Sequence, residues 1–310
     1  MARTVNKKVF KKLLVEIFCI FMIGSLSACG IHSKDVTNTQ KQVNNTMKTE
    51  DMKELPIYKY EVKEIRCDNS GQSIYGIAYV PKTEGKVPLV IFSHEFTNTH
   101  TSGIAYAENL ASHGIATYVF DFRGGSIKNK SDGKTTEMSV MTEVTDLESV
   151  IETAKNWDFV NPEKIVLLGG SQGGVVSAIT AARHNKELTG LILLYPAFVI
   201  EDDIHKMFSS LDEVPDTFSY RGWITVGRKY IEDMWDYDVY GEIGNFDKQV
   251  LILHGNEDNL VDISYSKRAA EKYDNAELYV IKGAGHGFGG SNFDEVMTYI
   301  WQYLHQVEII

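Results

Sequence analysis

Short apolar runs alternate with amphipathic segments from about residue 58 to the end of the chain. Alternation of polar and apolar residues predicts two strands, 59–66 and 72–80, around an Asn-Ser-Gly turn. Apolar runs predict buried strands at 87–93, 115–120, 164–168, 191–194, 250–253 and 278–281. Helical periodicity predicts helices at 103–113, 141–156, 174–184, 263–272 and 292–305. This alternation predicts an α/β fold with a mainly parallel sheet covered by helices on both faces.

One long interval interrupts the alternation, between the strand at 191–194 and the strand at 250–253. Residues 197–246 are rich in aromatic side chains, and an insertion of this length usually has a function. We therefore expect a lid insertion after strand 6, over the carboxyl edge of the sheet. The alternative is a surface subdomain whose aromatic residues fill only its own small core.

The N-terminus has the three parts of an export signal. Four lysines between residues 7 and 12 precede an apolar run from Leu13 to Leu26, which only Glu16 interrupts. This run is too short for a comfortable membrane span and predicts a signal peptide over residues 1–28. The sequence Leu-Ser-Ala-Cys-Gly at 26–30 resembles a bacterial lipobox, which implies cleavage before Cys29 and a lipid on its thiol. The alternatives are an ordinary secretory signal or an uncleaved anchor.

The expected organisation has three parts: the signal peptide at 1–28, a flexible tether at 29–55 and one folded domain at 56–310. The tether is polar and has too few large apolar residues to fold. A lipid on Cys29 predicts attachment to the extracellular face of a bacterial cell membrane. The sequence leaves the oligomeric state open.

Charge and cysteine content exclude several other classes of protein. A formal net charge of −11 argues against nucleic acid as a partner. Of three cysteines, Cys19 leaves with the signal, Cys29 carries lipid and Cys67 remains alone, so no disulfide framework is expected. The Cys and His residues lack zinc spacing, and we expect no metal and no cofactor.

A candidate nucleophile follows the strand at 164–168. The sequence Gly-Gly-Ser-Gln-Gly-Gly at 169–174 places Ser171 on a tight strand-to-helix turn, which presents its hydroxyl above the sheet. Glycine-rich turns of this kind also bind phosphate, but the Gly-Lys-Ser/Thr ending of a P-loop is absent.

A serine nucleophile needs a base and a carboxylate that orients the base. His286 stands between glycines just after the strand at 278–281, whereas His113, His184 and His305 fall near helix ends or on the last helix. Asp258 follows the strand at 250–253, with Glu257 and Asp262 as close rivals. The order Ser171, Asp258, His286 predicts a catalytic triad.

The oxyanion of such a reaction needs amide donors. We expect one from Gln172, at the start of the helix after the nucleophile, and one from Phe96, in the loop after the strand at 87–93. Asp121 and Arg123 follow another strand, and we interpret them as structural residues that hydrogen-bond loop backbone.

From about residue 58 to 305 the chain resembles the α/β-hydrolase superfamily, in its bacterial cinnamoyl/feruloyl esterase-like branch and the related serine-aminopeptidase-like hydrolases. The resemblance rests on residues 93–97 (Ser-His-Glu-Phe-Thr), 121–126 (Asp-Phe-Arg-Gly-Gly-Ser), 170–176 (Gly-Ser-Gln-Gly-Gly-Val-Val), 254–261 (His-Gly-Asn-Glu-Asp-Asn-Leu-Val) and 285–288 (Gly-His-Gly-Phe). It implies an α/β-hydrolase fold and a lid that shapes an aromatic acyl pocket.

One position departs from that branch, which usually has glycine where this chain has Glu95. Glycine would give the oxyanion loop conformational freedom that glutamate lacks. A carboxylate here could also disfavour anionic substrates, whereas a side chain that points into solvent would do neither. With Glu95, we expect Trp223, Trp235 and Tyr237 of the insertion to contact substrate.

The combined prediction is a serine hydrolase that cleaves small carboxylic esters, including hydroxycinnamoyl or other aromatic or short-acyl esters, without a cofactor. The first alternative is a peptidase or aminopeptidase-like amide hydrolase with the same triad. The second alternative is a catalytically inactive binding protein tethered to the cell surface.

Overall fold

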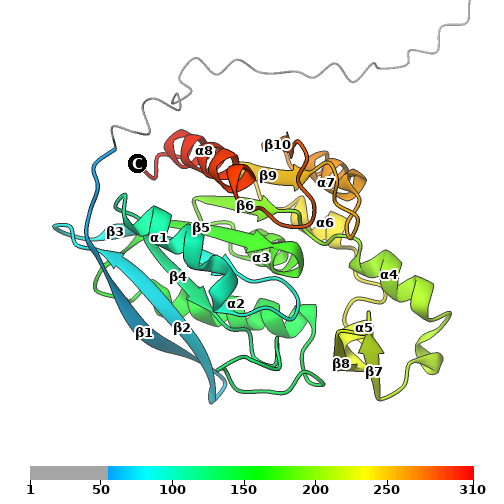
Figure 1. Cartoon of the computed structure of the whole chain (residues 1–310). Coiled ribbons are helices and arrows are strands. Elements are labelled where there is room, and N and C mark those ends of the chain that lie inside the picture. Colours follow the sequence, from blue (N-terminus) through cyan, green and yellow to red (C-terminus); the bar gives the residue numbers. More distant parts are fainter. Residues whose placement is uncertain (1–54) are drawn as a thin grey trace, which may run out of the picture. The chain divides into compact units, whose positions relative to one another are not determined.

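The computed structural model describes residues 55–310, in which the helices are arranged around an eight-stranded sheet (Figure 1). The predicted signal peptide, Cys29 and nearly all of the predicted tether lie outside the described residues. The sheet has the strand order β1-β2-β4-β3-β5-β6-β9-β10. Its strands are β1 (Tyr60–Asn69), β2 (Gln72–Pro81), β3 (Val87–Ser93), β4 (Ala116–Phe120), β5 (Val160–Gly170), β6 (Gly190–Leu194), β9 (Val250–Gly255) and β10 (Ala276–Ile281).

The sheet is mainly parallel, as the alternation of strands and helices predicts. β2 pairs antiparallel with β1 and β4, and all other neighbours are parallel. The flanking helices are α1 (Ile104–Ala111), preceded by the short η2 (His100–Gly103), α2 (Val140–Ala154), α3 (Ser171–Arg183), α7 (Ile263–Ala270) and α8 (Ser291–Gln306). The predicted α/β fold class is therefore confirmed.

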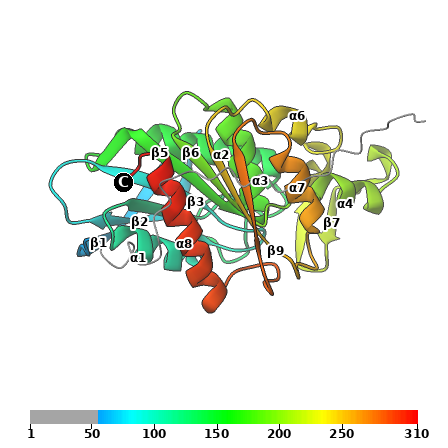
Figure 2. The same cartoon turned by 90° about the horizontal axis from the view of Figure 1, so that it is seen from above.

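Two buried apolar clusters lie on opposite faces of the sheet because successive strand residues point to opposite sides. One cluster joins Val90 and Phe92 of β3 to Leu110 of α1 and Trp301 of α8. The other joins Leu89 and Ile91 of the same strand to α2 and α3. Figure 2 shows α1 and α8 on one side of the sheet and α2 and α3 on the other.

Helix α3 begins at Ser171, three residues earlier than its apolar periodicity predicts. Its first residues are small or polar and carry no periodic signal, yet they are helical because the turn at Gly170 leads directly into the helix. The earlier start matters for the site, since the amides of the first helical turn have no partner within the helix.

The long interval between β6 and β9 contains elements that the sequence pattern did not resolve. They are α4 (Ile200–Met207), η3 (Leu211–Glu213), a separate two-stranded sheet of β7 (Thr217–Tyr220) and β8 (Ile224–Gly227), α5 (Lys229–Glu232) and α6 (Val239–Ile243). We call residues 197–246 the insertion. Across residues 55–310, each helix falls short of the length and apolar character that a membrane crossing requires.

Candidate active site

The turn from β5 into α3 places Ser171 in a left-handed backbone conformation with φ of 50°. Such a conformation is uncommon for a residue with a side chain, and backbone strain of this kind clusters at functional sites. The turn is close to its neighbours, because a Cβ on Gly169 would lie 2.2 Å from the carbonyl oxygen of Gly173. A Cβ on Gly173 would lie 2.3 Å from the carbonyl oxygen of Ser93. Both glycines are therefore needed for the turn that presents Ser171.

Ser171, His286 and Asp258 form one hydrogen-bonded series. The Oγ of Ser171 lies 2.8 Å from Nε2 of His286, and Nδ1 of His286 lies 2.7 Å from Oδ2 of Asp258. With the Nδ1 proton donated to the carboxylate, Nε2 is free to accept the proton of the serine hydroxyl. The structure thus brings together the three residues that the sequence pattern selects.

Asp258 is held on both of its oxygens. Oδ1 accepts hydrogen bonds of 2.9 Å from the amides of Leu260 and Val261, while Oδ2 faces His286 and, at 3.2 Å, Nε2 of His254. Burial would raise the pKa of Asp258, but the hydrogen bonds from His254, His286 and the Val261 amide outweigh it and lower the pKa. The carboxylate is thus ionised at neutral pH, as an orienting group must be.

The rival carboxylates and histidines have other environments. Asp262 caps α7 by accepting a hydrogen bond from the amide of Ser264, and the Glu257 side chain is exposed. His113 is bonded to the Asn109 carbonyl oxygen, and His305 is exposed on α8. Of these groups, none takes part in the hydrogen bonds of Ser171.

His254 supports the site and was missed at the level of sequence. It is fully buried, with Nδ1 2.7 Å from Oγ of Ser266 and Nε2 3.0 Å from the carbonyl oxygen of Val261. The imidazole therefore ties α7 to the loop that carries Asp258. The sequence feature that could have indicated this role is the position of His254 in β9, four residues before Asp258.

Gln172 connects the nucleophile turn to two distant segments. Its side-chain amide donates to Oε2 of Glu143 in α2 at 2.8 Å, and its side-chain oxygen accepts from the hydroxyl of Tyr230 in the insertion at 2.7 Å. All three side chains are buried. Burial raises the pKa of Glu143 to about 8, with a smaller opposing effect from the Gln172 hydrogen bond. Glu143 is therefore mainly a neutral carboxylic acid at pH 7.

A cavity of about 440 Å³ opens over Ser171 and His286. Phe96 and Gln172, the expected oxyanion donors, are in its lining, and so are Glu95 and Trp223. The Phe96 ring packs against insertion residues, with ring centroids 5.4 Å from Tyr220 and 5.6 Å from Tyr230. Aromatic side chains from the insertion therefore form one wall of the cavity above the nucleophile.

Two residues that we expect to contact substrate, Trp235 and Tyr237, are not in the lining of this cavity. The Trp235 ring packs on His205, with centroids 4.3 Å apart, and its carbonyl oxygen accepts from the histidine. The hydroxyl of Tyr237 accepts a hydrogen bond from Arg183 of α3. Both aromatic residues stabilise the packing of the insertion itself, a role that aromatic density alone does not separate from substrate binding.

Glu95 does not point into solvent. Its Oε1 accepts from the hydroxyl of Tyr195 at 2.9 Å, and its Oε2 accepts from the side-chain amide of Asn98 at 2.9 Å. The backbone at Glu95 does not require a glycine, because the left-handed residue of this loop is Thr97, with φ of 65°. The substitution therefore changes the chemistry of the cavity without requiring a strained backbone at Glu95.

Asp121 and Arg123 hold loops in place, as expected. Asp121 is fully buried, and its carboxylate accepts hydrogen bonds from the amides of His100 and Lys130. Arg123 donates to the buried Asp146 of α2.

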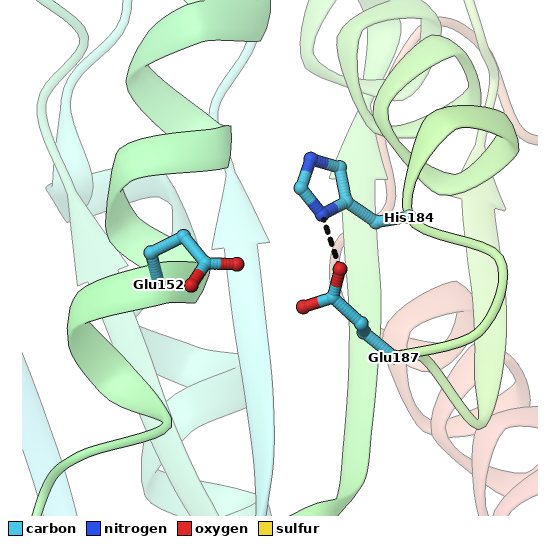
Figure 3. A group of neighbouring side chains, drawn as sticks. All are labelled: Glu152, His184 and Glu187. Atoms are coloured by element: carbon cyan, nitrogen blue, oxygen red, sulfur yellow. Dashed lines mark hydrogen bonds and ion pairs between the residues drawn. The ribbon is translucent and has the colours of Figure 1, made fainter.

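A second group of side chains has the chemistry of metal ligands (Figure 3). Glu152 of α2, His184 at the end of α3 and Glu187 offer ligand atoms within 4.8 Å of one another. The ammonium of Lys155, however, donates to Glu152 at 3.1 Å and also to Glu187. Both carboxylates thus already bind a lysine cation, and Glu152 is exposed, so the group is an ion-pair cluster in this structure.

The chain matches one family model and part of one known protein. The model is described as serine aminopeptidase, S33, and it covers residues 86–235. The quorum-quenching protein AidA of Acinetobacter baumannii is 26% identical over 125 residues. That match spans only 40% of the relative's length and 40% of this chain.

Solved structures are similar over most of the chain. Est1E from Butyrivibrio proteoclasticus with ferulic acid bound has a TM-score of 0.69 and 27% identity, and the match covers 78% of this chain and 98% of Est1E. DcsB in complex with its substrate analogue has a TM-score of 0.65 and 20% identity, over 80% of this chain and 99% of DcsB. Alpha/beta hydrolase domain-containing protein 10 from mouse has a TM-score of 0.64 and 17% identity, over 79% of this chain and 99% of the mouse protein. The last two similarities establish the fold alone.

Proposed function

Because the chain belongs to the α/β-hydrolase superfamily, we propose that it is a serine hydrolase that cleaves carboxylic esters through an acyl-enzyme intermediate. The observation that carries the proposal is the hydrogen-bonded series from Ser171 through His286 to Asp258, inside a cavity large enough for a small ester.

In the first half of the reaction, Oγ of Ser171 attacks the acyl carbonyl carbon while Nε2 of His286 takes the hydroxyl proton. Asp258 stabilises the imidazolium that forms. The carbonyl oxygen becomes an oxyanion, which the amides of Phe96 and Gln172 would stabilise. The tetrahedral intermediate collapses, the bond to the alcohol oxygen breaks, and His286 gives its proton to the leaving alcohol.

In the second half, a water molecule attacks the acyl-enzyme and gives a proton to His286. The bond between the acyl carbon and Ser171 then breaks, and His286 returns the proton to Oγ. The products are one carboxylic acid and one alcohol. Every step uses side chains and amides of this chain, and the reaction needs no cofactor.

The preferred acyl group is aromatic or apolar in this proposal. Support comes from the wall of Phe96, Tyr220 and Tyr230 over the nucleophile, with Trp223 at the cavity edge. Est1E, whose structure holds ferulic acid, also suggests a hydroxycinnamoyl ester. We further propose that the insertion is a lid, because several of its residues cover the cavity that contains Ser171.

Amide hydrolysis is the second candidate, favoured by the family model described as a serine aminopeptidase. It would use the same triad and would differ in the leaving group. A non-catalytic binding protein is the third candidate, and the intact hydrogen-bonded series argues against it.

Two measurements test these candidates. A fluorophosphonate probe should label the full chain but not Ser171→Ala, and absence of label on the unmodified chain would contradict both enzyme candidates. Hydrolysis of p-nitrophenyl esters, methyl ferulate and aminoacyl anilides then separates them. Turnover of anilides alone would replace the ester proposal with the amide one.

The extracellular location is a separate proposal, supported only by the sequence of residues 1–30. In this proposal, cleavage before Cys29 and acylation of its thiol hold the protein on the outer face of the bacterial membrane. Metabolic labelling with a palmitate analogue should mark the normal chain and leave Cys29→Ala unmarked. Equal labelling of both would contradict the assignment.

A further inference from the structure

Glu95 introduces a fixed carboxylate into the cavity that contains Ser171. Its two oxygens accept from neutral donors, the hydroxyl of Tyr195 and the side-chain amide of Asn98. Within residues 55–310, no lysine, arginine or histidine forms an ion pair with it. The donors fix the position of the carboxylate without supplying a positive charge.

The other formal charges in the cavity lining neutralise one another. Asp203 and Arg221, both in the insertion, form an ion pair. Apart from His286 of the triad, Glu95 is therefore the only charged residue of the lining without an oppositely charged partner. The cavity has an excess negative charge, which favours a positively charged ligand group.

The carboxylate lies next to the reacting groups. Its Oε1 would be 2.8 Å from a Cβ on Gly170, the residue before the nucleophile. The side chain of Glu95 turns toward Tyr195, whereas the ring of its neighbour Phe96 packs on Tyr220 and Tyr230 of the insertion. Successive side chains of one loop thus line two different parts of the cavity, one acidic and one aromatic.

The acidic part faces the leaving-group side of the reaction. The Tyr195 ring contacts the His286 ring, with centroids 4.8 Å apart, and its hydroxyl donates to Glu95. His286 gives its proton to the leaving alcohol in the proposed mechanism, so groups beside its ring face the alcohol part of the ester. The aromatic wall is left for the acyl part.

We propose that the Glu95 carboxylate is a subsite for a cationic group on the alcohol part of the substrate, and that it disfavours carboxylates at the same place. The proposal rests on the proposed esterase function for the identity of the substrate. It narrows the substrate class to esters of an aromatic or apolar acid with an alcohol that carries an ammonium group.

Binding to the Ser171→Ala variant of the full chain tests the subsite without requiring turnover. The probes are the 2-(trimethylammonio)ethyl and 3,3-dimethylbutyl esters of 3-phenylpropanoic acid, which have the same shape and differ in charge. Calorimetry should give the ammonium ester a Kd that is lower than the Kd of the dimethylbutyl ester by a factor of about ten or more. High salt should reduce the ratio of these two Kd values. Equal Kd values, or no measurable binding of the ammonium ester, would overturn the proposal.

Two further variants in the same background locate the effect. Glu95→Gln keeps an oxygen acceptor and should reduce the ratio of the two Kd values to about one. Glu95→Gly serves the same purpose if the first variant does not fold. Glu108→Gln removes an equal charge from an exposed position of α1 outside the cavity, and it should leave the ratio unchanged. A ratio that persists in both Glu95 variants would overturn the proposal.

Turnover of the same two esters by the unmodified chain separates this proposal from the esterase function. Preferential binding of the ammonium ester without any turnover would support the subsite and contradict the esterase. Turnover of both esters with equal affinity would support the esterase and contradict the subsite.

Discussion

The hydroxyl of Tyr230 donates a 2.7 Å hydrogen bond to the side-chain oxygen of Gln172, the residue that follows the nucleophile. Gln172 in turn donates to the buried Glu143 of α2. The insertion is therefore connected, through one side chain, to the helix start whose amide is expected to stabilise the oxyanion. A displacement of the insertion would therefore change the position of that amide.

Removal of this hydrogen bond should slow catalysis. In Tyr230→Phe, the buried oxygen of Gln172 loses its donor, which should cost about 1–3 kcal/mol of unfolding free energy. We expect kcat to fall about tenfold with a smaller change in KM, because oxyanion stabilisation acts in the transition state. Steady-state kinetics with a p-nitrophenyl ester and urea unfolding measure the two effects.

Tyr240→Phe is the matched control for that experiment. Tyr240 is also a buried tyrosine of the insertion, and its hydroxyl donates to the carbonyl oxygen of Tyr265 at 3.3 Å. This variant should lose stability but keep its kcat. A similar fall of kcat in both variants would show that the Gln172 contact has no special role.

Glu143 should make the stability of the protein depend on pH. Burial raises its pKa from 4.5 to about 8, so between these pH values the folded chain binds more protons than the unfolded chain at this group. The contribution of Glu143 to the unfolding free energy therefore falls as pH rises from 4.5 to 8. Glu143→Gln cannot ionise and should avoid this loss, which is on the order of 2–4 kcal/mol.

Urea unfolding at several pH values tests this prediction. Glu143→Gln should be more stable than the unmodified chain at pH 8, and the difference should shrink toward pH 4.5. Glu108→Gln, which removes an exposed carboxylate, should not show this trend. A difference that stays constant with pH would mean that Glu143 is ionised in the folded protein.

Asp258 and its neighbour Asp262 should behave differently when each is changed to asparagine. Asp258→Asn should reduce kcat by about 10⁴, because an amide favours the wrong tautomer of His286. Asp262 only caps α7, so Asp262→Asn should keep nearly full activity and cost at most about 1 kcal/mol of stability. Loss of activity in Asp262→Asn alone would show that Asp262, and not Asp258, orients His286.

The KM for methyl ferulate should distinguish aromatic residues of the insertion that line the cavity from those that pack elsewhere. Trp223 lines the cavity, and Trp223→Ala should raise KM roughly fivefold, about 1 kcal/mol of lost contact. Trp235 packs on His205 outside the cavity, and Trp235→Ala should leave KM unchanged but lower stability by about 1–3 kcal/mol. The opposite pattern would contradict the placement of both side chains.

The positions of the candidate triad were accessible from the sequence because each residue lies immediately after a recognisable apolar strand. Ser171 follows β5 directly, Asp258 follows β9 and His286 follows β10. Strand ends of a parallel sheet meet at one edge, so local patterns are enough to predict that these residues converge. The mainly parallel sheet was predictable for the same reason.

The residues that support the site were not predictable from local patterns. Glu143 and Tyr230 come from two distant segments, and their contacts with the Gln172 side chain depend on burial that only the folded chain creates. The sequence also did not show that Trp235 and Tyr237 lie outside the cavity lining, because aromatic content does not specify which way a side chain faces. The backbone at Glu95 was not predictable either: the left-handed residue of the loop is Thr97, not Glu95.

The connection between β6 and β9 has an evolutionary consequence. These two strands are direct neighbours in the sheet, with Leu194 paired to Leu253, so the insertion begins and ends on an already complete strand pair. Replacement of residues 197–246 by another crossover would leave the register of the sheet and the three reacting residues intact. A new substrate specificity can therefore arise by exchange of this one segment, provided that the incoming segment supplies a hydrogen-bond donor to the side-chain oxygen of Gln172.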